Sequence, residues 1–195
     1  MRRALSRLGA FRIAAAGGRA ALLVLLPAAC LTSAGERTPA QAASAEGRAP
    51  LTVAHRGGAG LAPENTLAAV RKALELGVSA VELDVHLSSD GELVVIHDAV
   101  LARTTDAPGE VGERTLAELR LLDAAARYFG PPVERQPIPT LQEVLDLARS
   151  RAAVHVEIKL SSDGTPYPGI ESRVVDTLRR NGFLDQAAVL SFDFP

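Results

Sequence analysis

The stretch AVELDVHLSSDGELVVIHD, residues 80–98, decides the fold. Residues 80–87 are mostly apolar and rich in Val and Leu, which is typical of a strand inside a sheet. Ser88-Ser89-Asp90-Gly91 has the composition of a turn, and residues 93–96 form a second apolar run that ends at His97-Asp98. A connection this short cannot cross over between parallel strands, so we expect an antiparallel hairpin.

The hairpin should gather polar side chains on one face. With the turn centred on Ser89-Asp90, Glu82 falls opposite His97 to within about one residue, and cross-strand neighbours share a face. Glu82 and Asp84 are two residues apart, so both carboxylates point to the same side. Two carboxylates on one buried face repel each other unless a cation neutralises them.

Strands and helices alternate on both sides of this hairpin. Residues 51–54, 153–160 and 187–192 have the pattern of further strands, and no internal repeat is evident. The helical pattern covers residues 67–77, 116–126, 140–150 and 170–181. Thr140 and Glu143 have the spacing of a capping box at the start of the third helix. The alternation predicts a parallel α/β architecture.

The polar residues cluster at the carboxyl ends of successive strands, which is typical of a (β/α)8 TIM-type barrel. A doubly wound sheet is the alternative, but its first turn usually carries a glycine-rich phosphate loop, whereas this chain has His55-Arg56-Gly57-Gly58 there. Residues 51–195 are too few for eight strand–helix units. We therefore expect an α/β barrel that is truncated after the fifth strand.

A third carboxylate comes from the strand at residues 153–160, where Glu157 and Lys159 repeat the spacing of Glu82 and Asp84. Three carboxylates without a cysteine make a hard-oxygen site, suited to one divalent cation, Ca²⁺ or Mg²⁺. The alternative is that these carboxylates face solvent at strand edges with Lys159 as their partner.

Two of the four histidines, His55 and His97, each close a strand beside turn-forming residues, where a substrate could reach them. His86 continues the face of Glu82, and His155 precedes Glu157 on its strand. The pattern alone does not exclude His86 and His155 as ligands, but a single histidine within a strand is more often structural.

An ordered series of short motifs resembles the glycerophosphodiester phosphodiesterase family, from about Val53 to Asp193. The motifs are His55-Arg56-Gly57, Pro63-Glu64-Asn65-Thr66, Glu82-Leu83-Asp84-Val85, Asp90-Gly91, Val95-Ile96-His97-Asp98, Arg103-Thr104-Thr105, Ile138-Pro139-Thr140-Leu141 and Glu157-Ile158-Lys159. Each motif alone is weakly specific, but the ordered set is highly specific. The resemblance implies a phospholipase-C-like barrel and metal-dependent hydrolysis of glycerophosphodiesters to glycerol 3-phosphate and an alcohol.

The resemblance also implies roles for individual residues. Arg56 and Lys159 would bind the substrate phosphate and stabilise charge on its oxygens. His55 and His97 would be the catalytic base and acid, in an order that the sequence does not assign. The metal ligands would be Glu82, Asp84 and Glu157.

Three residues would support this site. Glu64 and Asn65 would shape the first loop, and Asp98 would orient His97. In the implied reaction a glycerol hydroxyl attacks the phosphorus and expels the alcohol, and water then opens the resulting cyclic phosphate.

Other functions remain open at this stage. A phospholipase-D-like or wall-polymer phosphodiesterase could use the same scaffold. The chain could also be a truncated, non-catalytic surface protein. The expected partner is a small-molecule substrate, and no protein partner is evident.

The N-terminal part is expected to be a targeting signal and a linker rather than part of the folded domain. Residues 1–30 join an Arg-rich start to a short apolar run with small residues at its end, which predicts a signal peptide and an exported protein. Cys30, the single cysteine, follows Leu26-Pro27-Ala28-Ala29 and could be lipidated as in a bacterial lipoprotein. Lipid anchoring at a membrane and plain secretion remain equal alternatives. Residues 31–50, rich in Ala, Thr, Ser and Gly, are expected to form a flexible linker.

The charge is distributed unevenly. Five of the 21 basic residues and none of the 23 acidic residues lie in residues 1–30, so the rest of the chain carries 16 and 23, a balance of −7. An acidic domain argues against nucleic-acid binding, which requires a basic surface.

Overall fold

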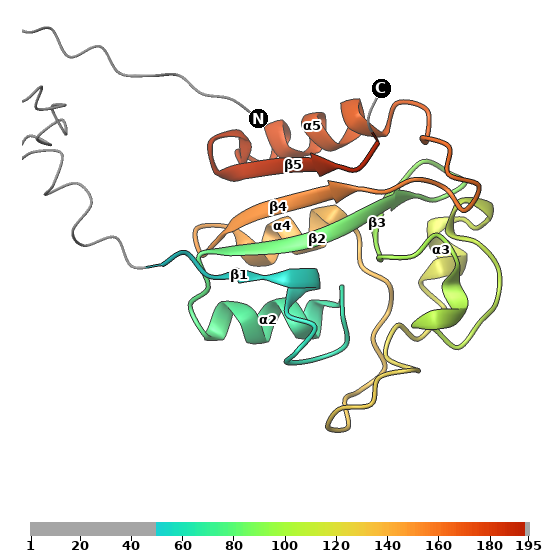
Figure 1. Cartoon of the computed structure of the whole chain (residues 1–195), viewed down its shortest axis with the longest axis horizontal. Coiled ribbons are helices and arrows are strands. Elements are labelled where there is room, and N and C mark those ends of the chain that lie inside the picture. Colours follow the sequence, from blue (N-terminus) through green and yellow to red (C-terminus); the bar gives the residue numbers. More distant parts are fainter. Residues whose placement is uncertain (1–49, 194–195) are drawn as a thin grey trace, which may run out of the picture. The chain divides into compact units, whose positions relative to one another are not determined.

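In the computed structural model, which describes residues 50–193, the central strand is β2 (Ala80–Leu87), buried along its whole length. The sheet has the order β1-β2-β4-β5, with all three pairings parallel. Its other members on this path are β1 (Val53–Ala54), β4 (Ala153–Ile158) and β5 (Ala187–Ser191). Figure 1 shows these four strands side by side. The predicted parallel α/β architecture is confirmed.

The predicted hairpin is also confirmed. β3 (Leu93–Val95) pairs antiparallel with the end of β2, and Leu87 lies opposite Leu93. The Ser88 hydroxyl accepts a hydrogen bond from the Glu92 amide at 2.9 Å and so closes the turn. The strand ends at Val95, one residue earlier than predicted.

Three helices cover one face of the sheet: α2 (Leu67–Glu75), α4 (Leu141–Ala148) and α5 (Ile170–Arg180). Their apolar side chains pack with those of alternate residues of the strands, such as Leu83 on β2 and Val156 on β4, in one buried core. The other residues of these strands, Glu82 and Glu157 among them, point to the opposite face because successive side chains alternate.

The segment between β3 and α4 has a small core of its own. It contains the short helices η2 (Leu101–Arg103), η3 (Val111–Glu113) and α3 (Leu116–Leu119). Leu101, Val111 and Leu119 are fully buried against Ile138. Figure 1 shows this segment beside the end of the β2–β3 hairpin.

Some predicted ends of elements were wrong. The helix expected over residues 116–126 ends at Leu119 because the Asp123 side chain accepts hydrogen bonds from the amides of Ala125 and Gln136, which ties the chain into a turn. The first strand begins at Val53 rather than residue 51, α4 ends at Ala148, and β4 and β5 end at Ile158 and Ser191.

The capping box predicted at Thr140 and Glu143 is present, with the Thr140 hydroxyl accepting from the Glu143 amide. In the described residues no helix is long and apolar enough to cross a membrane. The signal peptide predicted at residues 1–30, Cys30 within it, and residues 31–49 of the linker lie outside the described part of the chain.

Candidate functional site

Three carboxylates meet on the face of the sheet opposite the helices. The parallel register sets Asp84 on β2 directly beside Glu157 on β4, and Glu82 lies two residues before Asp84 on the same face. One oxygen from each of the three side chains lies within 4.8 Å of the others. Glu82 and Asp84 are buried, so the alternative of solvent-facing carboxylates at strand edges does not hold for them.

Two of these oxygens are buried without a hydrogen bond. They are Oε1 of Glu82 and Oδ1 of Asp84. Burial, followed by the nearby charges of Asp84 and Glu157, raises the pKa of Glu82 above its ordinary value. Unsatisfied carboxylate oxygens in a buried cluster have the chemistry of ligands for a hard divalent cation, so the residues fit such an ion.

Lys159 follows β4 and reaches back to the carboxylates. Its Nζ lies 3.0 Å from Asp84 Oδ1, without the alignment of a hydrogen bond, and also bonds Glu157. Burial would lower the pKa of Lys159, but the hydrogen bond to Glu157 and the charges of Asp84 and Glu157 raise it, so this side chain is held as an ammonium ion.

The turn after β1 presents a backbone donor to this cluster. β1 leads into η1 (His55–Gly57), where Arg56 has φ 51°, in the left-handed region. In this conformation the Arg56 amide donates to Glu82 Oε2 at 2.7 Å. Gly57 and Gly58 continue with positive φ, and a Cβ at Gly57 would lie 3.2 Å from Val70 Cγ2. Glycine is therefore required next to Arg56 both for the turn and for its close approach to α2.

His55 lies at the exposed rim of the cluster. Its Nε2 is 3.9 Å from Glu82 Oε2, and its side chain is 72% exposed. The end of β1 thus holds an accessible imidazole next to one of the carboxylates.

Asn65 holds the central carboxylate in place. Its side-chain amide donates to Asp84 Oδ2 at 2.8 Å, and its oxygen accepts from the Asp84 amide at 3.3 Å. Asn65 is buried and has φ 56°, a conformation that asparagine tolerates better than most residues.

Glu64 joins two arginines. It accepts from Arg56 Nη1 at 3.2 Å and from Arg103 Nη2 at 2.6 Å. Burial would raise the pKa of Glu64, but the hydrogen bond and charge of Arg103 and the charge of Arg56 hold it below its ordinary value.

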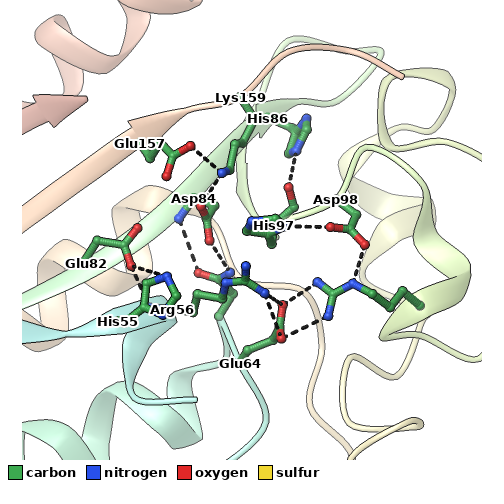
Figure 2. A network of polar contacts seen from close by, with 12 residues as sticks. His55, Arg56, Glu64, Glu82, Asp84, His86, His97, Asp98, Glu157 and Lys159 are labelled. Carbon is green, nitrogen blue, oxygen red and sulfur yellow. Dashed lines mark hydrogen bonds and ion pairs between the residues drawn. The ribbon is translucent and has the colours of Figure 1, made fainter. Parts of the chain in front are cut away.

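Arg103 also reaches Asp98, which in turn bonds the second candidate catalytic histidine. Asp98 Oδ1 lies 2.5 Å from His97 Nδ1, and Asp98 Oδ2 accepts from Arg103 Nε. Burial opposes the shift, but the hydrogen bonds from Arg103 and His97 lower the pKa of Asp98. The contacts therefore run from Arg56 through Glu64, Arg103 and Asp98 to His97. Figure 2 labels Arg56, Glu64, Asp98 and His97 in this series.

His97 comes to the site by a bend rather than by strand pairing. The observed register, in which Val85 lies opposite Val95, would place Leu83 rather than Glu82 opposite His97 if it continued. The prediction that Glu82 lies opposite His97 is therefore correct to within one residue. A shift of one residue changes the face of a strand, however, so pairing alone does not place His97 beside Glu82. Instead, the chain bends at His97 after β3 has ended.

The remaining histidines differ from each other. His86 is 1% exposed, with Nδ1 3.0 Å from the Tyr167 hydroxyl and Nε2 3.1 Å from the His97 carbonyl oxygen. His155 is half-buried on the face of Glu157. A cleft of about 350 Å³ is lined by His86, His97 and Lys159 together with residues 160–162.

The sequence did not single out Arg103 and Tyr167 as parts of the network. Arg103 stands in the motif Arg103-Thr104-Thr105, so a signal for it was present. Tyr167 lies in the β4–α5 loop, 81 residues from His86, and no periodicity marks it.

Comparison with known proteins gives these residues a context. The family model described as the glycerophosphoryl diester phosphodiesterase family matches residues 55–184. This chain belongs to that family. A glycerophosphodiester phosphodiesterase of Caldanaerobacter subterraneus is 41% identical over 143 residues, which are 73% of this chain and 58% of the relative.

Solved structures of glycerophosphodiester phosphodiesterases agree. The crystal structure of one from Agrobacterium tumefaciens is 36% identical, with a TM-score of 0.66 over 74% of this chain and 59% of that one. An Oleispira antarctica phosphodiesterase, solved with the product sn-glycerol-3-phosphate, is 35% identical, with a TM-score of 0.63 over 74% and 58%. These matches confirm the predicted barrel-type α/β fold. The chain spans somewhat less than 60% of the length of these relatives.

Proposed function

We propose that this protein hydrolyses glycerophosphodiesters to glycerol 3-phosphate and an alcohol, with one divalent cation and two histidines. The observation that carries the proposal is the cluster of Glu82, Asp84 and Glu157 with His55 at its rim, together with the cleft that Lys159 shares with the Asp98-bound His97. Membership of the glycerophosphodiester phosphodiesterase family and the product bound to the Oleispira relative support it.

The three carboxylates would hold the cation, Ca²⁺ or Mg²⁺. When bound, the ion would polarise a phosphoryl oxygen and offset its charge. Arg56 and Lys159 add two cationic side chains beside the carboxylates, where they stabilise the charge that develops on the phosphoryl oxygens.

The two imidazoles move the protons. As a glycerol hydroxyl oxygen bonds to phosphorus, one histidine takes its proton, and the other gives a proton to the alcohol oxygen as that P–O bond breaks. Water then opens the cyclic phosphate with the roles reversed. Because Asp98 accepts from His97 Nδ1, the Nε2 atom of His97 is free for this transfer.

Glycerol 3-phosphate release from glycerophosphocholine tests the proposal. Full-length protein should be active with added Ca²⁺ or Mg²⁺ and inactive in excess EDTA. His55→Ala and His97→Ala should each lower kcat by roughly 10²- to 10⁴-fold. His155→Ala, a histidine on the same face without a proposed role, is the matched control. Activity that persists in EDTA and in both variants would refute the mechanism.

We also propose that the protein is exported and that Cys30 is its site of lipidation. The arginine-rich, apolar layout of residues 1–30 supports export, and the position of Cys30 after Ala28-Ala29 supports lipidation. Metabolic labelling with a fatty acid should mark the full-length protein and not Cys30→Ser. Export without label would indicate secretion.

A further inference from the structure

His86 contacts the backbone of the proposed acid–base residue His97 rather than its imidazole. Its imidazole is buried on β2, between the Tyr167 hydroxyl and the His97 carbonyl. Figure 2 shows the contact with His97. Both ring nitrogens are therefore engaged in hydrogen bonds. A buried histidine with two partners on two other segments has a defined orientation.

The partners determine which nitrogen of His86 carries the proton. The His97 carbonyl oxygen can only accept, so Nε2 of His86 donates to it. In the neutral ring Nδ1 is then the acceptor, and the Tyr167 hydroxyl donates to it at 3.0 Å.

Tyr167 is itself held from two sides. Its ring meets the His86 ring edge-on, with centroids 5.6 Å apart and planes at 89°. On the other side a Cβ added at Gly112, in η3, would lie only 3.2 Å from the Tyr167 ring. The phenol therefore links the β4–α5 loop to β2 and to the segment after β3.

The His97 carbonyl oxygen, which His86 contacts, lies in a stretch of backbone with few other hydrogen bonds. The Ile96 amide donates to the backbone carbonyl oxygen of Asp84 at 3.1 Å, which is the last backbone hydrogen bond between the two strands of the hairpin. In the part of the chain that the structure describes, the next backbone hydrogen bond joins Val111 to Ala99 at 2.9 Å. The His97 carbonyl lies between these two points, in the bend.

We propose that His86, oriented by Tyr167, is a positioning residue that fixes the backbone of His97. The inference rests on the proposed function in so far as His97 is an acid–base residue. The Asp98 contact orients the His97 ring from the side chain, and the His86 contact holds the peptide that carries it. Both are needed, because a displacement of about 1 Å can cost roughly 10²-fold in rate.

Variants at His86 and Tyr167 test the inference in the full-length protein. His86→Leu removes both contacts, and we expect kcat for glycerophosphocholine to fall about 10- to 100-fold with KM changed less than about threefold. His86→Gln can donate from its amide nitrogen and accept at its oxygen, so it should stay within about threefold of wild type. Tyr167→Phe should show an intermediate loss, and Tyr128→Phe, at the only other tyrosine, is its matched control.

A merely structural role would give a different pattern. His86→Gln would then follow His86→Leu, or kcat, KM and melting temperature would change together in all variants. Either result, or unchanged kcat in His86→Leu, would overturn the inference.

Hydrogen exchange separates this inference from the proposed activity. The amides of Ile96 and Leu101 are hydrogen-bonded and flank the bend. Peptides that cover them should exchange faster in His86→Leu but not in His86→Gln or Tyr128→Phe. Unchanged exchange in His86→Leu refutes the positioning role whether or not the enzyme is active. Faster exchange in a protein whose wild type releases no glycerol 3-phosphate supports the contact and refutes the proposed function.

Discussion

The ammonium group of Lys159 lies 3.0 Å from Oδ1 of Asp84 and also bonds Glu157, so a side chain of the protein already offsets part of the charge of the three clustered carboxylates. A divalent cation would share these carboxylates with Lys159. The same lysine thus stabilises the cluster without a cation and weakens the attraction of the cluster for one.

Replacement of Lys159 by methionine should separate these two effects. Without divalent cations we expect Lys159→Met to lose about 3 kcal/mol of stability, because its removal leaves a buried carboxylate unpaired. Added Ca²⁺ should then raise its melting temperature more than that of wild type, since no ammonium competes. Thermal melts in EDTA and over a Ca²⁺ series measure both.

Lys72→Met is the matched control. Lys72 is the only other lysine, it is exposed, and it donates to the backbone carbonyl oxygen of Leu61 and not to a carboxylate. Its Ca²⁺-induced shift should equal that of wild type. An equal shift in Lys159→Met as well would show that the ammonium group does not compete with the cation.

Arg103 should make stability depend on pH in a defined direction. Despite burial, which would raise them, the pKa values of Glu64 and Asp98 lie below their ordinary values because of hydrogen bonds and charge from Arg103. A carboxyl whose pKa is lowered by folding stabilises the fold above its ordinary pKa and loses that effect as pH falls through the lowered value.

We therefore expect Arg103→Met to lose about 1 kcal/mol at pH 7, an amount limited by the exposure of Arg103. The difference from wild type should shrink as pH falls below 4.5 and 3.8, the ordinary values for Glu64 and Asp98. Urea unfolding at several pH values measures it. Arg127→Met is the control, because Arg127 is exposed and lines a hollow together with Glu64 and Arg103. A difference that grows toward low pH would contradict the assignment.

The turn at Gly57 should be intolerant of a side chain, whereas a nearby glycine should accept one. Gly57 has φ 75°, and a Cβ added there would lie close to the Val70 side chain. Gly60 has no positive φ, and no atom lies within 4 Å of the place that its Cβ would take. We expect Gly57→Ala to lose roughly 1–2 kcal/mol or more and to weaken Ca²⁺ binding, since the Arg56 amide would leave Glu82. Gly60→Ala should be neutral to about 0.5 kcal/mol more stable. Urea unfolding and Ca²⁺ titration of both variants provide the test, and equal effects would exclude a special role for the turn.

The sequence predicted those parts of the site that follow from regular periods. Glu82, Asp84 and Glu157 could be placed on one face because side chains alternate along a strand and adjacent parallel strands align their faces. The hairpin followed from the short connection, residues 88–92. The alternation within each strand and the hairpin depend on spacings of a few residues, which a single sequence displays.

Contacts made by irregular segments could not be predicted in this way. Arg103 reaches Glu64 across 39 residues, and Tyr167 reaches His86 across 81. Arg103 ends the three-residue helix η2 and Tyr167 lies in a loop, and neither segment is long enough for a period to fix the direction of a side chain. The bend at His97 is another such case, since the apolar pattern runs on to Ile96 and does not show that the chain turns away after it.

Asn65 offers a way to separate a backbone effect from a side-chain effect at the site. It combines a positive φ with two hydrogen bonds to Asp84, a fully buried carboxylate. Asn65→Gly keeps the freedom to adopt this φ but removes the side chain, and we expect a loss of about 1.5–3 kcal/mol from the hydrogen bond to a charged group. Asn65→Ala removes the same bonds and should cost about 1–2 kcal/mol more, since alanine disfavours the left-handed region.

Urea unfolding of wild type and both variants measures the two contributions. In Ca²⁺ titrations both variants should bind more weakly than wild type and by similar factors, because each leaves Asp84 without its orienting amide. If Asn65→Gly were as stable as wild type, the side-chain bonds to Asp84 would contribute nothing, and the residue would serve only the turn. If Asn65→Gly and Asn65→Ala were equally destabilised, the positive φ would carry no cost at this position.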